Sequence, residues 1–330
     1  TCDHSLVPQP AGVTGTLDAL DRVVRIDYSQ DAEPREYLYD QGPFGLGRLS
    51  EGRSAAGSHV YEYDRFGRLV RDGDLTYAYD RNGNRTEVTY PGGVRALYGF
   101  DFADREGTLD LEMPDLSLRA IVLDASYEPS GPLARLELAN GLVEEREFDE
   151  RYYPSRIRLA ASGQPATLDW QYTVDPVGNP LAISDPVLGN RTYGYDPVQY
   201  FLTRGDGPWG QRSWTYDKIG NRLSETQESG LPQTYVYVPN GISGNTAILD
   251  RIEQGGPFAD YTYDAEGNLV EVDRAGNVVS MSYDGTGRFA RGERASVEPV
   301  RFVYDHRDFL RCVERGDGAI FRDDFESGDT

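Results

Sequence analysis

The segment Asp80–Asn84, DRNGN, carries side-chain oxygens at its first, third and fifth positions. This is how an EF-hand calcium loop begins, and such a loop is completed by a glutamate at its twelfth position. Pro91 stands at that position here, and Arg81 and Arg85 add two positive charges to the turn. The sequence therefore favours a turn in which the Asp80 carboxylate accepts backbone N–H groups. Calcium is the weaker alternative, and we expect no other cofactor.

The residue types that act as nucleophiles and bases are few or scattered. His4, His59 and His306 are the only histidines, and they stand in unrelated sequence contexts. The segment NGISGN around Ser243 lacks the Gly-x-Ser-x-Gly pattern of a nucleophile elbow. The 55 Asp and Glu residues are too abundant for spacing to single out an acid–base pair. We therefore predict that the chain is not an enzyme and has no catalytic, cofactor-binding or metal-binding residues.

Charge and hydropathy narrow the partners. The net charge is −22, and Lys218 is the only lysine, so the clustered basic residues that bind a phosphate backbone are missing. No run of about 18 apolar residues is present, so we expect neither nucleic-acid binding nor membrane insertion. Cys2 and Cys312 lie near the two ends and are candidates for one disulfide, within one chain or between two. Two buried free thiols are the alternative.

The elements that would position these residues follow an internal repeat. Tyr-Asp or a degenerate form of it recurs along the chain, and six of the thirteen intervals between second positions are 21 residues. The second positions are 18, 40, 64, 80, 101, 128, 149, 175, 196, 217, 238, 264, 284 and 305. Each copy predicts a strand, a tight turn and a second strand, followed by a variable loop.

The copy at residues 77–93 shows the physical logic. Tyr77 and Tyr79 lie two apart, so a strand places both rings on one face, where they stabilise neighbouring strands. Asp80 ends the strand, and Gly83 supplies the positive φ of the turn. Turns without glycine at this offset, which begin at residues 18, 101, 149, 196 and 305, are predicted to be wider or otherwise built. The predicted structural turn residues are Asp64, Gly67, Asp80, Gly83, Asp217, Gly220, Asp264, Gly267, Asp284 and Gly287.

The segments YDRFGRLV, YDRNGNRTEVTYPGG, YDKIGNRLSE and YDAEGNLVEV resemble the YD repeats of the Rhs family, which bacterial Rhs proteins, toxin-complex C components and teneurins share. The resemblance implies an all-β chain of tandem antiparallel hairpins, wound into a spiral strip or partial hollow shell. We assign residues 1–12 to an N-terminal segment, 13–313 to about thirteen repeats and 314–330 to an acidic tail. Larger family members enclose a toxin and cleave themselves at a DPxGL-like motif. The segments DPVGN and DPVLGN lack its Gly-Leu, so we predict a short form without self-cleavage or toxin.

The expected dimensions suggest a function. About 26 strands at a spacing of about 4.8 Å give a strip near 125 Å long, which would wrap once around a cylinder about 40 Å in diameter. One turn cannot enclose a folded toxin, and it leaves two free strand edges that can pair. We therefore predict a bacterial, secreted, non-catalytic structural protein that assembles with itself head to tail into a fibre or tube. The alternatives are a fragment of a larger toxin-enclosing Rhs shell and a carbohydrate-binding surface adhesin. The C-terminal segment IFRDDFESGDT is similar to tails of secreted proteins and supports export.

Overall fold

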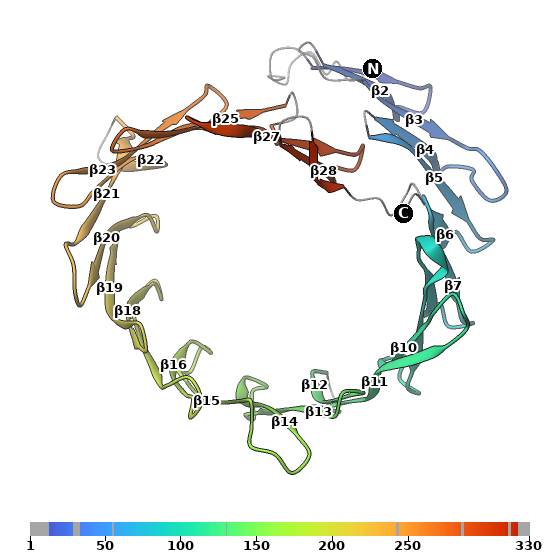
Figure 1. The fold of residues 1–330 in the computed structure, drawn as a ribbon, viewed down its shortest axis with the longest axis horizontal. Helices are drawn as coiled ribbons and strands as arrows, with labels where there is room; N and C mark the ends of the chain where they lie inside the picture. The colour runs from blue at the N-terminus through green and yellow to red at the C-terminus, as the bar shows by residue number, and fades with distance from the viewer. Residues whose placement is uncertain are drawn as a thin grey trace. The chain divides into compact units, whose positions relative to one another are not determined.

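A computed structural model describes residues 13–28, 34–54, 56–129, 131–241, 244–284, 287–315 and 318–322. These residues form an all-β chain, as predicted, and Figure 1 shows the strands following one another in chain order. The helical content of the described residues is one 3₁₀ turn, η2 (Pro91–Gly93). The alternating tyrosines and frequent glycines explain this outcome, since they favour strands and tight turns over helices.

The strands are short, mostly five to eight residues. Those of the first half are β1 (Val13–Leu17), β2 (Val23–Tyr28), β3 (Arg35–Tyr39), β4 (Leu49–Ser54), β5 (Gly57–Tyr63), β6 (Leu69–Asp72), β7 (Leu75–Tyr79), β8 (Arg85–Thr89), β9 (Arg95–Phe100), β10 (Glu106–Glu112), β11 (Leu118–Tyr127), β12 (Leu133–Leu138), β13 (Leu142–Phe148) and β14 (Pro154–Ala161). Those of the second half are β15 (Leu168–Val174), β16 (Pro180–Ser184), β17 (Arg191–Tyr195), β18 (Leu202–Gly207), β19 (Gly210–Tyr216), β20 (Arg222–Gln227), β21 (Gln233–Pro239), β22 (Asn245–Glu253), β23 (Pro257–Tyr263), β24 (Leu269–Arg274), β25 (Asn277–Tyr283), β26 (Phe289–Arg294), β27 (Val297–Tyr304), β28 (Leu310–Arg315) and β29 (Gly318–Arg322).

The strand pairs that the structure describes are antiparallel and join consecutive strands. Each Tyr-Asp turn follows an odd-numbered strand and precedes the next even-numbered one. In the hairpin β19–β20, Trp214 pairs with Glu225 and Tyr216 with Arg222, and the register shifts between Thr215 and Tyr216. The same shift occurs in β5–β6 and β25–β26, again just before the turn tyrosine. A bulge of this kind increases the local twist of a strand pair. Because the topology is sequential, the Tyr-Asp turns within each unit lie along the same edge of its strands.

The chain divides into two compact units: unit 1 comprises Thr1–Ala78, Glu87–Gly93 and Ala259–Thr330, and unit 2 comprises Tyr79–Thr86 and Val94–Phe258. Unit 1 thus brings together the first and last strands of the chain. Few described apolar side chains are fully buried, and most strand side chains are half-buried. A single layer of sheet offers little core, so contacts between neighbouring repeats must supply much of its stability.

The repeated strands extend farther than predicted. β28 ends at Arg315, and β29 pairs with it through Cys312 and Val313. β29 therefore lies inside the segment 314–330 that we assigned to an acidic tail. The alternation in GAIFR is too short to have indicated a strand from sequence alone. The predicted N-terminal segment 1–12 and residues 323–330 lie outside the described residues.

Candidate functional site

The Tyr-Asp turns share one hydrogen-bond pattern. In the turn at Asp217, Oδ1 accepts the backbone N–H of Ile219 at 3.0 Å and of Asn221 at 2.9 Å. Gly220 has a φ of 92° and donates its N–H to the Asp217 carbonyl at 3.2 Å. All ten predicted turn residues lie within the described residues. The Asp217 N–H donates to the carbonyl of Asn221, four residues on, and the turns that begin at residues 64, 80, 264 and 284 have the equivalent bond. Backbone N–H groups of the turn itself therefore occupy Oδ1 of the aspartate carboxylate.

The residue four positions after the aspartate is asparagine or arginine in the repeats quoted above, and it bonds the aspartate carboxylate. Asn221 donates its Nδ2 to Asp217 Oδ2 at 2.9 Å, and Arg105 donates its Nε to Asp101 Oδ2 at 2.8 Å. The arginine has a second role, because its guanidinium lies 4.7 Å from the ring centre of Tyr127 in the next repeat. Asparagine and arginine thus close the same turn, and arginine also links one repeat to the next.

Our expectation that the glycine-free turns are wider or otherwise built is wrong for four of the five. Asp21, Asp104, Tyr152 and Asp308 stand three residues after their turn aspartates, with φ between 58° and 70°, and each donates its N–H to the aspartate carbonyl. Aspartate, at three of these four positions, adopts this left-handed conformation at low cost because its short polar side chain bonds locally, so glycine is not required there. The turn at Asp196 is wider, as predicted, since Tyr200 donates to the Asp196 carbonyl.

In eight repeats, the tyrosine at the first position of the Tyr-Asp pair links successive hairpins by its hydroxyl. Tyr216 donates to the carbonyl of Leu202 at 2.8 Å, and Leu202 is the first residue of β18 in the preceding hairpin. This contact recurs for Tyr39, Tyr63, Tyr127, Tyr195, Tyr237, Tyr283 and Tyr304. The ring spacing alone did not reveal it. It accounts for tyrosine rather than phenylalanine at this position.

A cluster of titratable residues lies in unit 1, where the turn after β27 packs against β3, β4 and β5. His306 is 5% exposed, and its Nε2 lies 2.8 Å from the hydroxyl of Tyr61 on β5. Its ring centre is 5.6 Å from that of His59. Its backbone carbonyl accepts the hydroxyl of Tyr37 at 3.3 Å. His59 and His306 stand in unrelated sequence contexts, yet they meet in the structure, because the fold brings together residues that are distant in sequence.

Ion pairs complete what we call the histidine cluster: His59, Tyr61, Asp72, His306 and Arg307. Asp72 accepts hydrogen bonds from His59 Nε2 and, at 2.8 Å, from Arg307 Nη1. Arg307 also bonds Asp305, the aspartate of its own turn, at 3.0 Å. A second ion pair, between Arg35 on β3 and Asp308, measures 2.9 Å. The ion pairs Arg307–Asp72 and Arg35–Asp308 thus tie the turn to the early strands.

Burial and charge shift the protonation equilibria of this cluster. Burial lowers the pKa of His306 to about 4. The charge of Asp305 opposes this shift, and electrostatic interactions with His59, Arg307 and Arg35 add to it. Burial alone would raise the pKa of Asp72, but the His59 hydrogen bond and the Arg307 charge hold it below its ordinary value. Burial also raises the pKa of Tyr61. Nδ1 of His306 is buried and has no hydrogen-bond partner among the described residues.

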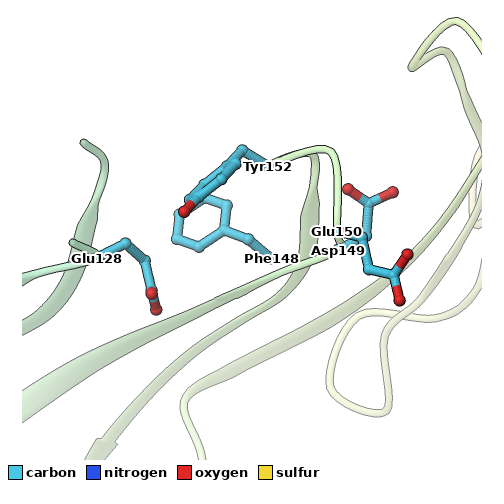
Figure 2. A pocket seen from close by; sticks show the side chains of 5 residues that line it. All are labelled: Glu128, Phe148, Asp149, Glu150 and Tyr152. Atoms are coloured by element: carbon cyan, nitrogen blue, oxygen red, sulfur yellow. The ribbon is translucent and has the colours of Figure 1, made fainter. Parts of the chain in front are cut away.

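A shallow open hollow of about 380 Å³ lies in unit 2. Its lining is Glu128, Phe148, Asp149, Glu150 and Tyr152. Figure 2 shows the rings of Phe148 and Tyr152 close together, with Glu128 on one side and Asp149 and Glu150 on the other. The two ring centres are 6.5 Å apart and tilted by 40°. Two aromatic faces beside carboxylates can stack against a sugar ring and accept its hydroxyls.

The described residues hold no group of three His, Cys, Asp or Glu side chains arranged to bind a metal ion. No helix within the described ranges is long and apolar enough to cross a membrane. Cys312 is a buried free thiol in this structure. Its pairing with Cys2 remains a prediction, since Cys2, like His4 and Ser243, lies outside the described residues.

Comparison with known proteins identifies the repeat and the fold. The family model described as RHS Repeat matches residues 263–288, and no curated protein matches the chain. The TcdB2–TccC3 crystal structure matches 93% of this chain with a TM-score of 0.66 and 14% identity, and the Tc holotoxin pore of Photorhabdus luminescens matches 93% with a TM-score of 0.66 and 15% identity. TcdB2–TccC3 without its hypervariable C-terminal region matches 94% at 15% identity, with a TM-score of 0.57. The chain covers 19–21% of these structures, so it corresponds to about a fifth of each.

Proposed function

We propose that this Rhs-repeat chain is a non-catalytic wall segment of a hollow β-shell. The observation that carries the proposal is the packing of the turn Asp305–Asp308 onto β3–β5 within unit 1. A late Tyr-Asp turn thus docks on early strands, which is how successive courses of a coiled strip would contact one another. The likeness of 93% of the chain to about a fifth of TcdB2–TccC3 is consistent with a segment of such a strip.

The edge of unit 2 along which its Tyr-Asp turns lie, here called the turn edge, offers a surface against which the next winding of the strip would pack. Phe102, Val177, Val198 and Ile219 stand one or two residues after their turn aspartates, and all are exposed, Phe102 at 98%. Sequential topology places these four turns along the same edge. A row of exposed apolar side chains of this kind marks a contact surface. Covering it with another course would remove it from water.

The natural gene product that contains this chain provides the test. We expect electron microscopy to show hollow particles, and we expect Phe102→Asp with Ile219→Asp to reduce their resistance to protease. Phe102→Leu with Ile219→Leu is the matched control and should retain the resistance. Filaments that lengthen with concentration and tolerate both Asp substitutions would contradict the wall. They would support the head-to-tail fibre, which requires pairing of strand edges rather than the turn edge.

Carbohydrate binding at the hollow around Phe148 and Tyr152 is the second candidate. The specific observation is the pair of aromatic rings between carboxylates that Figure 2 shows. Saturable binding in a glycan array that Tyr152→Ala abolishes would support it. Binding that survives this substitution would place the sugar elsewhere.

We also propose that the protein acts outside the bacterial cell. The acidic composition, with a net charge of −22, and the C-terminal FESGDT segment support export. Fractionation of the native host checks this proposal. Recovery of the chain in the cytoplasm alone would contradict it.

A further inference from the structure

We propose that the histidine cluster is an acid-released clasp, which holds the turn Asp305–Asp308 on β3–β5 near neutral pH and frees it in mild acid. The inference concerns unit 1 alone and does not depend on the shell proposal. Its basis is a buried imidazole at the centre of a contact between segments about 245 residues apart. Hairpin pairing along the strip does not involve this contact, so the clasp can open while the strands stay paired.

The surroundings of His306 suit the neutral ring. A neutral imidazole has one N–H and one acceptor nitrogen, whereas the protonated ring has two N–H donors and no acceptor. Nε2 faces the Tyr61 hydroxyl, but Nδ1 is buried and meets no partner in the part of the chain that the structure describes. Protonation therefore leaves a buried, charged donor unsatisfied, which is costly for the closed clasp. Solvent would satisfy the same donor once the turn has moved away.

Charged groups face His306 from each packed element. β3 contributes Arg35 and Tyr37, and β5 contributes His59 and Tyr61. Asp72, the last residue of β6, reaches the cluster through its bonds to His59 and Arg307. The turn itself contributes Asp305, Arg307 and Asp308, and Arg288 bonds Asp308 at 2.6 Å. Asp305 favours a charged ring, but the two nearest arginines, Arg35 and Arg307, oppose it.

Packing leaves the ring no room to find another partner while the clasp is closed. Gly52 of β4 lies so close that a Cβ atom there would overlap the His306 ring. On its other sides the ring meets Tyr37, Tyr61 and His59, with centres 5.6–6.0 Å away. A rotated or protonated ring must therefore displace the turn. The sheet around it can stay in place.

Hydrogen exchange resolved by peptide, corrected for intrinsic rates, tests the clasp between pH 7.5 and pH 4. In the wild-type chain we expect the opening equilibrium of peptides in β4, β5 and the turn to rise on the order of 100-fold by pH 4. His306→Gln keeps a polar group for Tyr61 but cannot titrate, so its profile should be flat. His4→Gln is the matched control and should follow the wild type. Trp170, Trp209 and Trp214 all lie in unit 2, so their fluorescence should stay constant while the clasp opens.

Three outcomes would overturn the proposal: a flat wild-type profile, an equal pH dependence in His306→Gln, or a change in tryptophan fluorescence at the same midpoint. If His306→Gln is already open at pH 7.5, NMR titration of the wild-type histidines decides. A His306 ring that titrates near 4 supports the clasp, and one that titrates near 6.5 contradicts it.

Discussion

The hydroxyl of Tyr61 lies 2.8 Å from Nε2 of His306, although 245 residues separate them in the sequence. Gly52, on the neighbouring strand, makes this approach feasible because it has no side chain to meet the imidazole. Its φ is not in the left-handed region, so alanine at this position is excluded by the ring and not by the backbone. The contact between early strands and a late turn therefore depends on one absent Cβ atom.

Gly52→Ala tests this dependence. We expect the overlap with His306 to lower the free energy of unfolding of unit 1 by about 1–3 kcal/mol, the usual cost of overpacking. Pulsed hydrogen exchange of the β4 and β5 peptides along a urea series measures it. Gly52→Ala with His306→Ala should be no less stable than His306→Ala alone, since the clash is gone. Gly15→Ala is the control, because nothing lies within 4 Å of its added Cβ atom. Equal effects of Gly15→Ala and Gly52→Ala would contradict the ring contact.

Tyr216→Phe tests the link between hairpins. The substitution removes the donor to the Leu202 carbonyl and leaves the ring in place. We expect unit 2 to lose about 1 kcal/mol of unfolding free energy. Urea denaturation followed by the fluorescence of Trp214, two residues away on β19, measures the loss. Tyr200→Phe, on a half-exposed turn tyrosine, is the comparison and should have a smaller effect.

Asp217→Ala tests the turn. It removes the acceptor of two backbone N–H groups and of the Asn221 amide. By analogy with the loss of a helix-capping side chain, we expect a cost of about 1–2 kcal/mol in urea denaturation of unit 2. Asp217→Asn retains Oδ1 as an acceptor and should cost less. If Asp217→Asn loses as much stability as Asp217→Ala, charge and not the Oδ1 bonds maintains the turn.

The sequence predicted what is local and missed what is distant. Asp217, Gly220 and Asn221 lie within five residues, so their spacing alone indicates the turn that the structure shows. His59 and His306 have no shared pattern, because only the path of the intervening strands brings them together. One signal was available: Gly52 interrupts the strand LSEGRS, and a glycine inside a strand often marks a close approach. It says that something approaches, but not which residue.

Tyr152→Gly tests whether the hollow around Phe148 is maintained at a cost. Tyr152 has a φ of 62°, which costs a non-glycine residue about 1–2 kcal/mol. Glycine removes that strain but also removes the contact with the Phe148 ring. We expect a net gain of roughly 0.5–1 kcal/mol in urea denaturation of unit 2, because the tyrosine is 46% exposed and its packing is partial. A loss of stability would mean that Tyr152 is a packing residue and would weaken the carbohydrate candidate.

The stability of unit 1 should depend on pH in two separate windows. The pKa of His306 is about 4 in the folded chain and near 6.5 when exposed, so the unfolded state binds the additional proton. Its contribution is therefore complete above pH 6.5 and is lost as the pH falls towards 4, by about 3 kcal/mol. Asp72 and Asp305 have lowered pKa values, so their contributions are lost only below about pH 3.8.

Urea denaturation of unit 1 at pH 7.5, 5, 4 and 3, followed by hydrogen exchange, separates these windows. His306→Gln should remove the loss between pH 6.5 and 4 and keep the loss below pH 3.8, because Asp72 and Asp305 are unchanged. Unit 2 contains no histidine among its residues, so it serves as the internal reference in both proteins. If the two proteins lose stability in parallel from pH 6.5 to 4, a group other than His306 governs the acid response of this contact.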